Sequence, residues 1–176
     1  MPDHSKHLMR LFNGHLKLDE EALTNLFLGQ LGNIYCSKSH LLSVLPGLSA
    51  KASFPELKNA ILEGIDNIKM QILRMDVIYS NFNMVYAEEK CMGIKSITLE
   101  AHLASHAENK SPLFIDMSIL THLRIIESIE ITSFNILKDI AASLNNPDVS
   151  TLLNQNIQSA MNTKLIFELI SKEYIS

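Results

Sequence analysis

Apolar residues recur along most of this chain at alternating steps of three and four, the spacing of one face of an α-helix. Strand-like alternation of apolar and polar residues is scarce. The strongest helix breakers in the sequence are Pro2, Pro46, Pro55, Pro112 and Pro147, and Pro46 lies inside the first long helix, where a kink is expected. The spacing therefore predicts an all-α protein.

Residues that favour helix starts place the elements. Asp19 opens a long helix that ends near Ala50, and Ser53 caps a second one that ends near Tyr86. Two more long helices begin at Pro112 and Pro147, each preceded by a residue that can cap a helix.

A shorter helix over about 92–107 lies between the second and third long helices. This connection is long enough to cross the length of a bundle, so the pattern predicts a ferritin-like four-helix bundle whose crossover contains a short extra helix. Another short helix is expected over 3–16. We therefore divide the chain into an N-terminal helical extension (1–18) and the bundle (19–176).

The inner faces of the long helices are apolar except near their middles. The predicted inner positions are Phe27, Leu31, Ile34, Lys38, Leu41, Leu45 and Leu48 in the first; Leu57, Ile61, Gly64, Ile68, Gln71, Met75, Ile78 and Phe82 in the second; Leu120, Leu123, Glu127, Glu130, Phe134, Leu137 and Ala141 in the third; and Leu153, Ile157, Ala160, Lys164 and Phe167 in the fourth. The middle of a bundle is where inward carboxylates and histidines bind paired iron or manganese.

Lys38 has two interpretations. It forms an internal ion pair with Glu127 or Glu130, or it lies at the surface with its stem on the apolar seam and its ammonium in water. In the first case the ammonium takes the space of a lost metal, and Gly64 leaves room for the lysine stem. A small apolar ligand in a vacated centre is a further hypothesis.

Composition and charge argue against two classes of function, nucleic-acid binding and membrane spanning. Charged residues make up 19% of the chain, against about 25% in a typical globular domain. A net charge of -4 gives no electrostatic footprint for nucleic acid, and no stretch reaches the roughly 18 apolar residues that indicate a membrane span. Without an export signal, we expect a soluble cytoplasmic protein in which Cys36 and Cys91 are free thiols.

The chain resembles the YciE/YciF family of bacterial stress-associated proteins. The resemblance rests on Leu26-Phe27, Gln30-Leu31, Ile34-Tyr35, Leu41-Leu42, Leu45-Pro46, the SFPELK run over 53–58, Gln71, Arg74, the 90–93 run, Asp116, and Glu127 to Phe134. It covers about residues 23–169. It implies a ferritin-like bundle with an extra helix, a fold in which many members are suited to a dinuclear metal site.

The metal-site positions of that family carry over poorly. Lys38 stands where the family has a glutamate in its first long helix. In the second helix, Gly64 and Asn67 stand in place of a histidine and a glutamate. Glu127 and Glu130 match acidic positions, but the histidine between them is replaced by Ser128. The acidic run of the fourth helix is replaced by Gln158, Ser159 and Ala160.

Other candidate groups are weaker. His102 and His106 share one helix face near Glu100, which is a spacing that zinc can use, but a surface pair without a ligand is favoured. We assign structural roles to His40 and His122 and a solvated terminus to His4 and His7. Cys36 lies near Lys38, although a packing role is favoured over a reactive thiol.

These observations favour a non-enzymatic bundle without a cofactor, acting as a homodimer or on a protein partner, with a stress context implied by the resemblance alone. The alternative is an iron or manganese protein for redox chemistry or storage, with an atypical site at Glu127 and Glu130.

Overall fold

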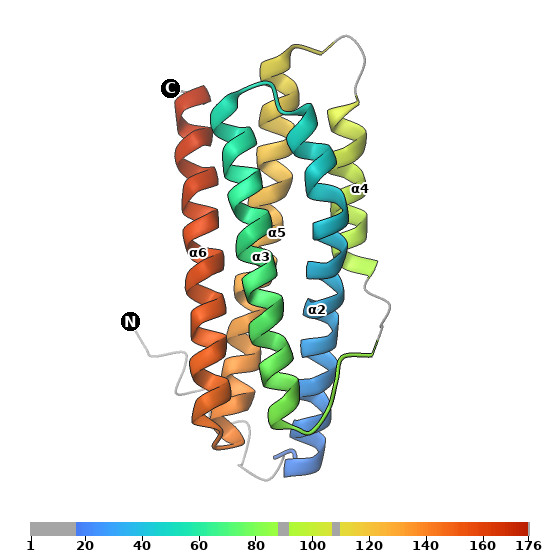
Figure 1. Cartoon of the computed structure of the whole chain (residues 1–176), viewed down its shortest axis with the longest axis vertical. Helices are drawn as coiled ribbons and strands as arrows, with labels where there is room; N and C mark the ends of the chain where they lie inside the picture. The colour runs from blue at the N-terminus through green and yellow to red at the C-terminus, as the bar shows by residue number, and fades with distance from the viewer. Residues whose placement is uncertain (1–16, 88–91, 107–109, 176) are drawn as a thin grey trace, which may run out of the picture.

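A computed structural model describes residues 17–87, 92–106 and 110–175, and this part of the chain forms five helices (Figure 1). They are α2 (Glu20–Lys51), α3 (Pro55–Asn81), α4 (Met92–Ser105), α5 (Pro112–Ser143) and α6 (Pro147–Ile175). The all-α prediction is confirmed. The helix predicted over 3–16 lies outside the described residues.

The four long helices form one bundle, and α4 packs on its outside against α2 and α5. The α2–α3 and α5–α6 pairs are antiparallel hairpins, while the connection through α4 returns the chain to the end of the bundle where α5 begins (Figure 1). This is the ferritin-like arrangement with one crossover that the sequence predicts.

Polar caps set most helix starts where the sequence predicts them. The side chains of Asp19, Ser111 and Asn146 accept hydrogen bonds from backbone N–H groups in the first turns of α2, α5 and α6, at 2.8, 3.2 and 3.1 Å. Each satisfies a donor that the helix itself leaves unpaired.

The start of α3 differs from the prediction. Its N-cap residue is Phe54, and Ser53 makes no side-chain cap. Instead the buried carboxylate of Asp116, on α5, accepts hydrogen bonds from the backbone N–H groups of Ser53 and Phe54, each at 2.9 Å at its shortest. A side chain distant in sequence thus caps α3 and ties it to α5.

The end of α3 also differs, since the helix stops at Asn81 and not near Tyr86. Asn83 adopts a left-handed backbone conformation, with φ at 53°, which ends the helix. Asparagine tolerates this conformation better than most residues. Phe82 therefore leaves the predicted seam, although its ring still packs on Phe27.

The inner positions predicted for α2 and α5 are all buried, as are those of α3 up to Ile78. Two apolar clusters occupy the two ends of the bundle, one around Leu48, Ile61 and Leu120 and the other around Phe27 and Phe134. The polar residues of the seam lie between these clusters. None of the described helices is long and apolar enough to cross a membrane.

Candidate functional site

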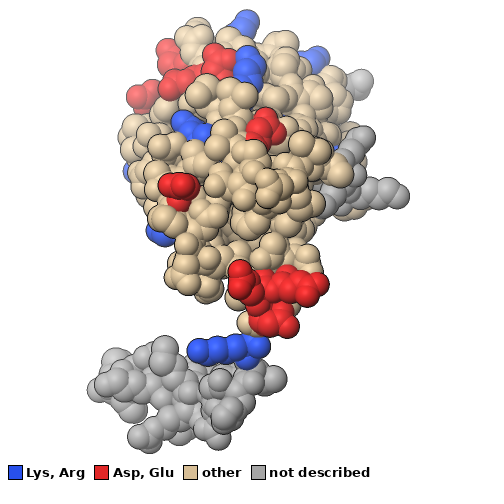
Figure 2. Space-filling view, turned by 60° about the horizontal axis from the view of Figure 1, so that its bottom comes forward, with Lys and Arg blue, Asp and Glu red and all other residues tan. Residues whose placement is uncertain are grey.

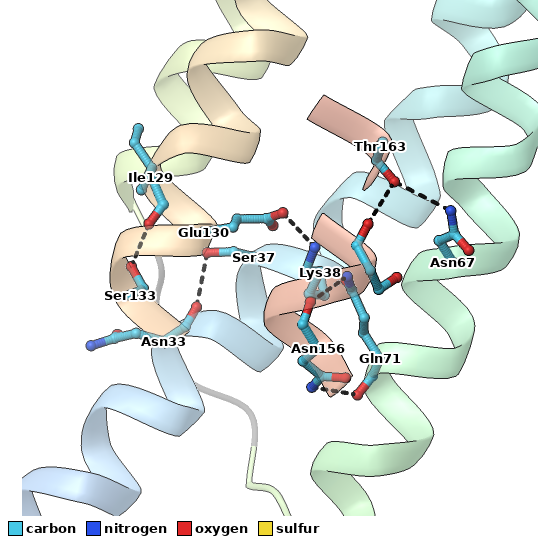
Figure 3. A network of polar contacts seen from close by, with 11 residues as sticks. Asn33, Ser37, Lys38, Asn67, Gln71, Ile129, Glu130, Ser133, Asn156 and Thr163 are labelled. Carbon is cyan, nitrogen blue, oxygen red and sulfur yellow. Dashed lines mark hydrogen bonds and ion pairs between the residues drawn. The ribbon is translucent and has the colours of Figure 1, made fainter. Parts of the chain in front are cut away.

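An ion pair lies in the middle of the bundle. The ammonium of Lys38, on α2, donates a hydrogen bond to Glu130 Oε2, on α5, and the two residues are 0% and 2% exposed (Figure 3). Of the two interpretations of Lys38, the structure shows the internal pair. The ring of Phe134 lies 6.0 Å from the ammonium, so the pair abuts the apolar cluster below it.

Glu127 lies one turn before Glu130 and is also buried. Burial raises the pKa of the Glu127 carboxyl from 4.5 to about 8; the negative charge of Glu130 adds to the rise and Lys38 opposes it. Glu127 is therefore predominantly protonated at neutral pH. The ammonium and one carboxylate then leave the centre with no net charge, which lowers the cost of burying these groups.

Amide groups occupy the same level on α3 and α6. Gln71 Nε2 donates to the Asn156 backbone carbonyl at 3.4 Å, and Asn156 Nδ2 donates to the Gln71 carbonyl at 3.3 Å (Figure 3). Arg74 also donates to the Asn156 side chain, at 3.3 Å. This reciprocal pair fastens α3 to α6 with neutral groups.

A second link joins α3 to α6 one level along the bundle. Asn67 Nδ2 donates to Thr163 Oγ1 at 3.2 Å, and Thr163 donates in turn to the Ser159 carbonyl. Asn67 is thus engaged as a structural amide.

Gly64 does not make room for the lysine stem, so that prediction is wrong. A Cβ placed there would have the Thr163 methyl carbon as its nearest neighbour, at 3.8 Å, which is ordinary van der Waals contact. Gly64 faces α6, whereas Lys38 reaches towards α5. An alanine would therefore fit at this position.

The residues at the centre do not fit a dinuclear metal site. Such a site takes carboxylates from all four helices and histidines from two. Here α3 and α6 supply amides and a hydroxyl, and a cation holds Glu130. Across residues 17–87, 92–106 and 110–175, no group of three or more His, Cys, Asp or Glu side chains is placed to hold a metal ion.

Three oxygens in this region receive no hydrogen bond: Gln71 Oε1, Glu127 Oε2 and Glu130 Oε1. Each buried acceptor left unpaired costs free energy. Lys38 bonds one oxygen of Glu130 and leaves the other unpaired. The centre is therefore polar and only partly satisfied.

His40 and His122 both contact polar groups of α4. His40 Nε2 lies 2.8 Å from Thr98 Oγ1, and burial lowers the pKa of this histidine. His122 Nδ1 donates to the Ser118 carbonyl at 2.7 Å, and its other nitrogen lies 3.7 Å from Glu100.

The rings of His102 and His106 lie 4.3 Å apart, and His106 Nδ1 donates to the His102 carbonyl, a local bond along the helix. His4 and His7 lie outside the described residues.

Cys36 is disulfide-bonded, so the prediction of a free thiol at this position is wrong. Its neighbours along α2 include Lys38, and the bond therefore lies close to the ion pair in sequence. Cys91, the other cysteine of the sequence, lies outside the described residues.

By its fold the protein is a ferritin-like helical bundle. The chain belongs to the family described as "Domain of unknown function (DUF892)", whose model matches residues 22–175. This confirms the resemblance to the YciE/YciF type.

Two solved structures share the fold. The E. coli stress protein YciF aligns with a TM-score of 0.83 and 19% identity, over 87% of this chain and 96% of that one. YcfI, a putative structural protein from Rhodopseudomonas palustris, aligns with a TM-score of 0.79 and 19% identity, over 89% and 97%. No match was found among the curated proteins.

Sequence reasoning missed two central residues of α6. Asn156 and Thr163 are buried and bonded to α3, whereas Lys164, predicted to face inward, is partly exposed beside Glu168. The missed signal is that Asn156 and Thr163 are seven residues apart and therefore share a face with the apolar Ala160.

Proposed function

We propose that this protein is a non-enzymatic helical bundle in which the Lys38–Glu130 ion pair replaces a dinuclear metal site, and that it works by binding protein, either a second copy of itself or a partner. The observation that carries the proposal is the position of the Lys38 ammonium, which bonds a carboxylate of α5 at the centre of the bundle. A cation there repels any metal ion that approaches the same carboxylates.

The state of Glu127 supports the same conclusion. A carboxylate must be deprotonated to bind a metal, and the pKa of Glu127 is raised to about 8. For a metal pair to bind, Lys38 would have to leave Glu130, and Glu127 would have to lose its proton. The side-chain N–H groups of Gln71 and Asn156 each donate to the other residue's backbone carbonyl.

Self-association is supported by the surface. Figure 2 shows one face on which uncharged residues predominate, with a group of acidic side chains gathered at its lower edge. Many large apolar side chains of the described helices are also at least 40% exposed, among them Leu73, Ile125 and Leu165. Contiguous apolar surface often marks a binding site for another protein.

The proposed role in stress rests on the descriptions of the two similar structures. A role in stress extends the description of E. coli YciF to this chain, and a structural role extends that of YcfI. A cytoplasmic location stays a prediction, and the disulfide at Cys36 counts against it because disulfides persist mainly in oxidising compartments.

Metal content tests the proposal. Protein purified without chelators is dialysed against Fe²⁺ or Mn²⁺ under anaerobic conditions, and bound metal is measured by mass spectrometry. The wild type should retain no stoichiometric metal. Lys38→Glu should bind metal, because it replaces the cation beside Glu130 with a carboxylate. Lys164→Glu, a change at the partly exposed lysine of α6, is the matched control. Stoichiometric metal on the wild type would favour the iron or manganese alternative at Glu127 and Glu130.

A further inference from the structure

A pocket opens beside the ion pair, between α2, α4 and α5. Its volume is about 270 Å³, and Glu130 is one of the residues that line it. The lining includes exposed residues, such as Asn33 and Met92, as well as buried ones, such as Ile34 and Glu130. The pocket therefore leads from the surface of the bundle to the Lys38–Glu130 pair.

The carboxylate of Glu130 is only half used by Lys38. The ammonium donates to Oε2, whereas Oε1 receives no hydrogen bond from the described residues. Glu130 is 2% exposed, so bulk water does not replace the missing donor. Oε1 is therefore a buried acceptor without a donor, in a residue that lines the pocket.

Two serine hydroxyls add further acceptors to the same pocket. Ser37 donates its proton to the Asn33 carbonyl at 2.8 Å, and Ser133 donates to the Ile129 carbonyl at 2.9 Å (Figure 3). A hydroxyl has one proton, so each of these oxygens can now only accept. Together with Glu130 Oε1 they make three acceptor oxygens, and a ligand bound there has to supply the donors.

Most of the other side chains that line the pocket are apolar. They come from all three helices and are Ile34, Met92, Ile94, Ile97 and Ile129. A cavity needs only about 10–15 Å³ to hold one water molecule, so this pocket has room for a molecule of several heavy atoms. Its lining suits a ligand with a short aliphatic body and a polar head.

The charges at the centre of the bundle favour a cationic head. Glu127 and Glu130 place two buried carboxyl groups there, and Lys38 balances one of them. A second cation beside Glu130 would stabilise the ionised form of Glu127, so that two cations would face two carboxylates. An ammonium group also carries three N–H donors, one for each of the three acceptor oxygens.

We propose that this pocket binds a small primary amine. The ammonium donates to Glu130 Oε1 and to the hydroxyls of Ser37 and Ser133, and the aliphatic body packs on isoleucines of α2, α4 and α5. The site goes beyond the proposed function, because it assigns a small-molecule ligand to the oxygen of Glu130 that the ion pair leaves without a donor.

Three probes that share an isobutyl group test the choice of an ammonium. The ¹⁵N-labelled full chain is titrated with 2-methylpropan-1-amine, 2-methylpropan-1-ol and 3-methylbutanoate in phosphate buffer, which contains no amine, and amide resonances are followed by NMR. The amine should shift the resonances of Glu130 and Ser133 saturably, at one molecule per chain. The alcohol has a single donor and no charge, so it should bind at least tenfold more weakly.

The anionic probe and potassium chloride provide the contrary results. Met92 and Gly93, in the first turn of α4, also line the pocket, and a helix N-terminus favours anions. Binding of 3-methylbutanoate in preference to the amine would therefore overturn the proposal. Displacement of the amine by an equal concentration of potassium ion would overturn an organic ligand, and no saturable shift with any probe would show that water alone occupies the pocket.

Serine variants test the location of the site without disturbing the ion pair. Ser133→Leu should fill the pocket and abolish amine binding, and Ser37→Ala should weaken it about tenfold by removing one acceptor. Ser128→Leu is the matched control, because Ser128 is a half-buried serine of α5 that donates along its own helix but lies outside this pocket. Circular dichroism checks that all three variants fold. Amine affinity that is unchanged in Ser133→Leu would overturn the site.

Discussion

Lys38 and Glu130, which are 92 residues apart in the sequence, form a buried ion pair that joins α2 to α5 at the centre of the bundle. Both side chains lose nearly all contact with water, so each depends on the other for compensation. The pair is therefore expected to be sensitive to removal of one partner and tolerant of replacement of both.

Lys38→Met should lower the free energy of unfolding by about 3–5 kcal/mol at pH 7, because it leaves the Glu130 carboxylate without its cation. Lys38→Met combined with Glu130→Leu should recover most of this loss, since no charge then stays buried. Urea denaturation followed by circular dichroism measures both. A single variant as stable as the wild type would show that the pair does not hold the fold.

Glu127 predicts a particular pH dependence. Its pKa is raised from 4.5 to about 8 in the folded chain, so above pH 4.5 the folded state holds a proton that the unfolded state has released. The contribution of Glu127 to stability should fall as the pH rises from about 4.5 to about 8, by at most about 1.4 kcal/mol per pH unit, and then level off.

The matched comparison is Glu127→Gln, which keeps a neutral side chain of the same shape. The unfolding free energy of this variant minus that of the wild type should become more positive from pH 5 to pH 8, as measured by urea denaturation at each pH. A difference that stays constant, or that falls, would contradict the protonated state of Glu127.

Asp116→Asn should destabilise the protein by about 2 kcal/mol, because it replaces a charged acceptor for the backbone N–H groups of Ser53 and Phe54. Asp66→Asn is the control, since Asp66 pairs with Lys69 at the exposed surface of α3. Thermal unfolding should separate the two variants. Equal melting temperatures would show that the cap from α5 adds little.

Gly64→Ala should raise the unfolding free energy by about 1 kcal/mol, because alanine favours helix and its methyl group meets the Thr163 methyl at an ordinary distance. Gly29→Ala, where a Cβ meets no atom within 4 Å, should give a similar gain. If Gly64→Ala instead weakens the protein while Gly29→Ala strengthens it, the centre needs the space.

The sequence predicted the bundle well because apolar spacing reports the direction in which a side chain points. Phe27, Leu120 and Phe134 are buried for that reason. Spacing does not report how deeply a side chain is buried, so it allows Lys38 two interpretations. The contact with Glu130 on α5 decides between them.

The missed features depend on contacts that are distant in the sequence. The cap on α3 comes from Asp116, 62 residues from Phe54, so no local pattern indicates it. On α6, the prediction placed Lys164 on the inner face. The buried residue is its neighbour Thr163, one position away. The disulfide at Cys36 is likewise a pairing that spacing along one helix cannot predict.

The most direct test of the central claim is a crystal structure of the wild type grown in the presence of Mn²⁺, with anomalous scattering recorded for manganese. Substitution of the metal site by the ion pair predicts the Lys38 ammonium bonded to Glu130 and no anomalous peak between α2 and α5. A peak within coordination distance of Glu127 and Glu130, with Lys38 turned away, would contradict it.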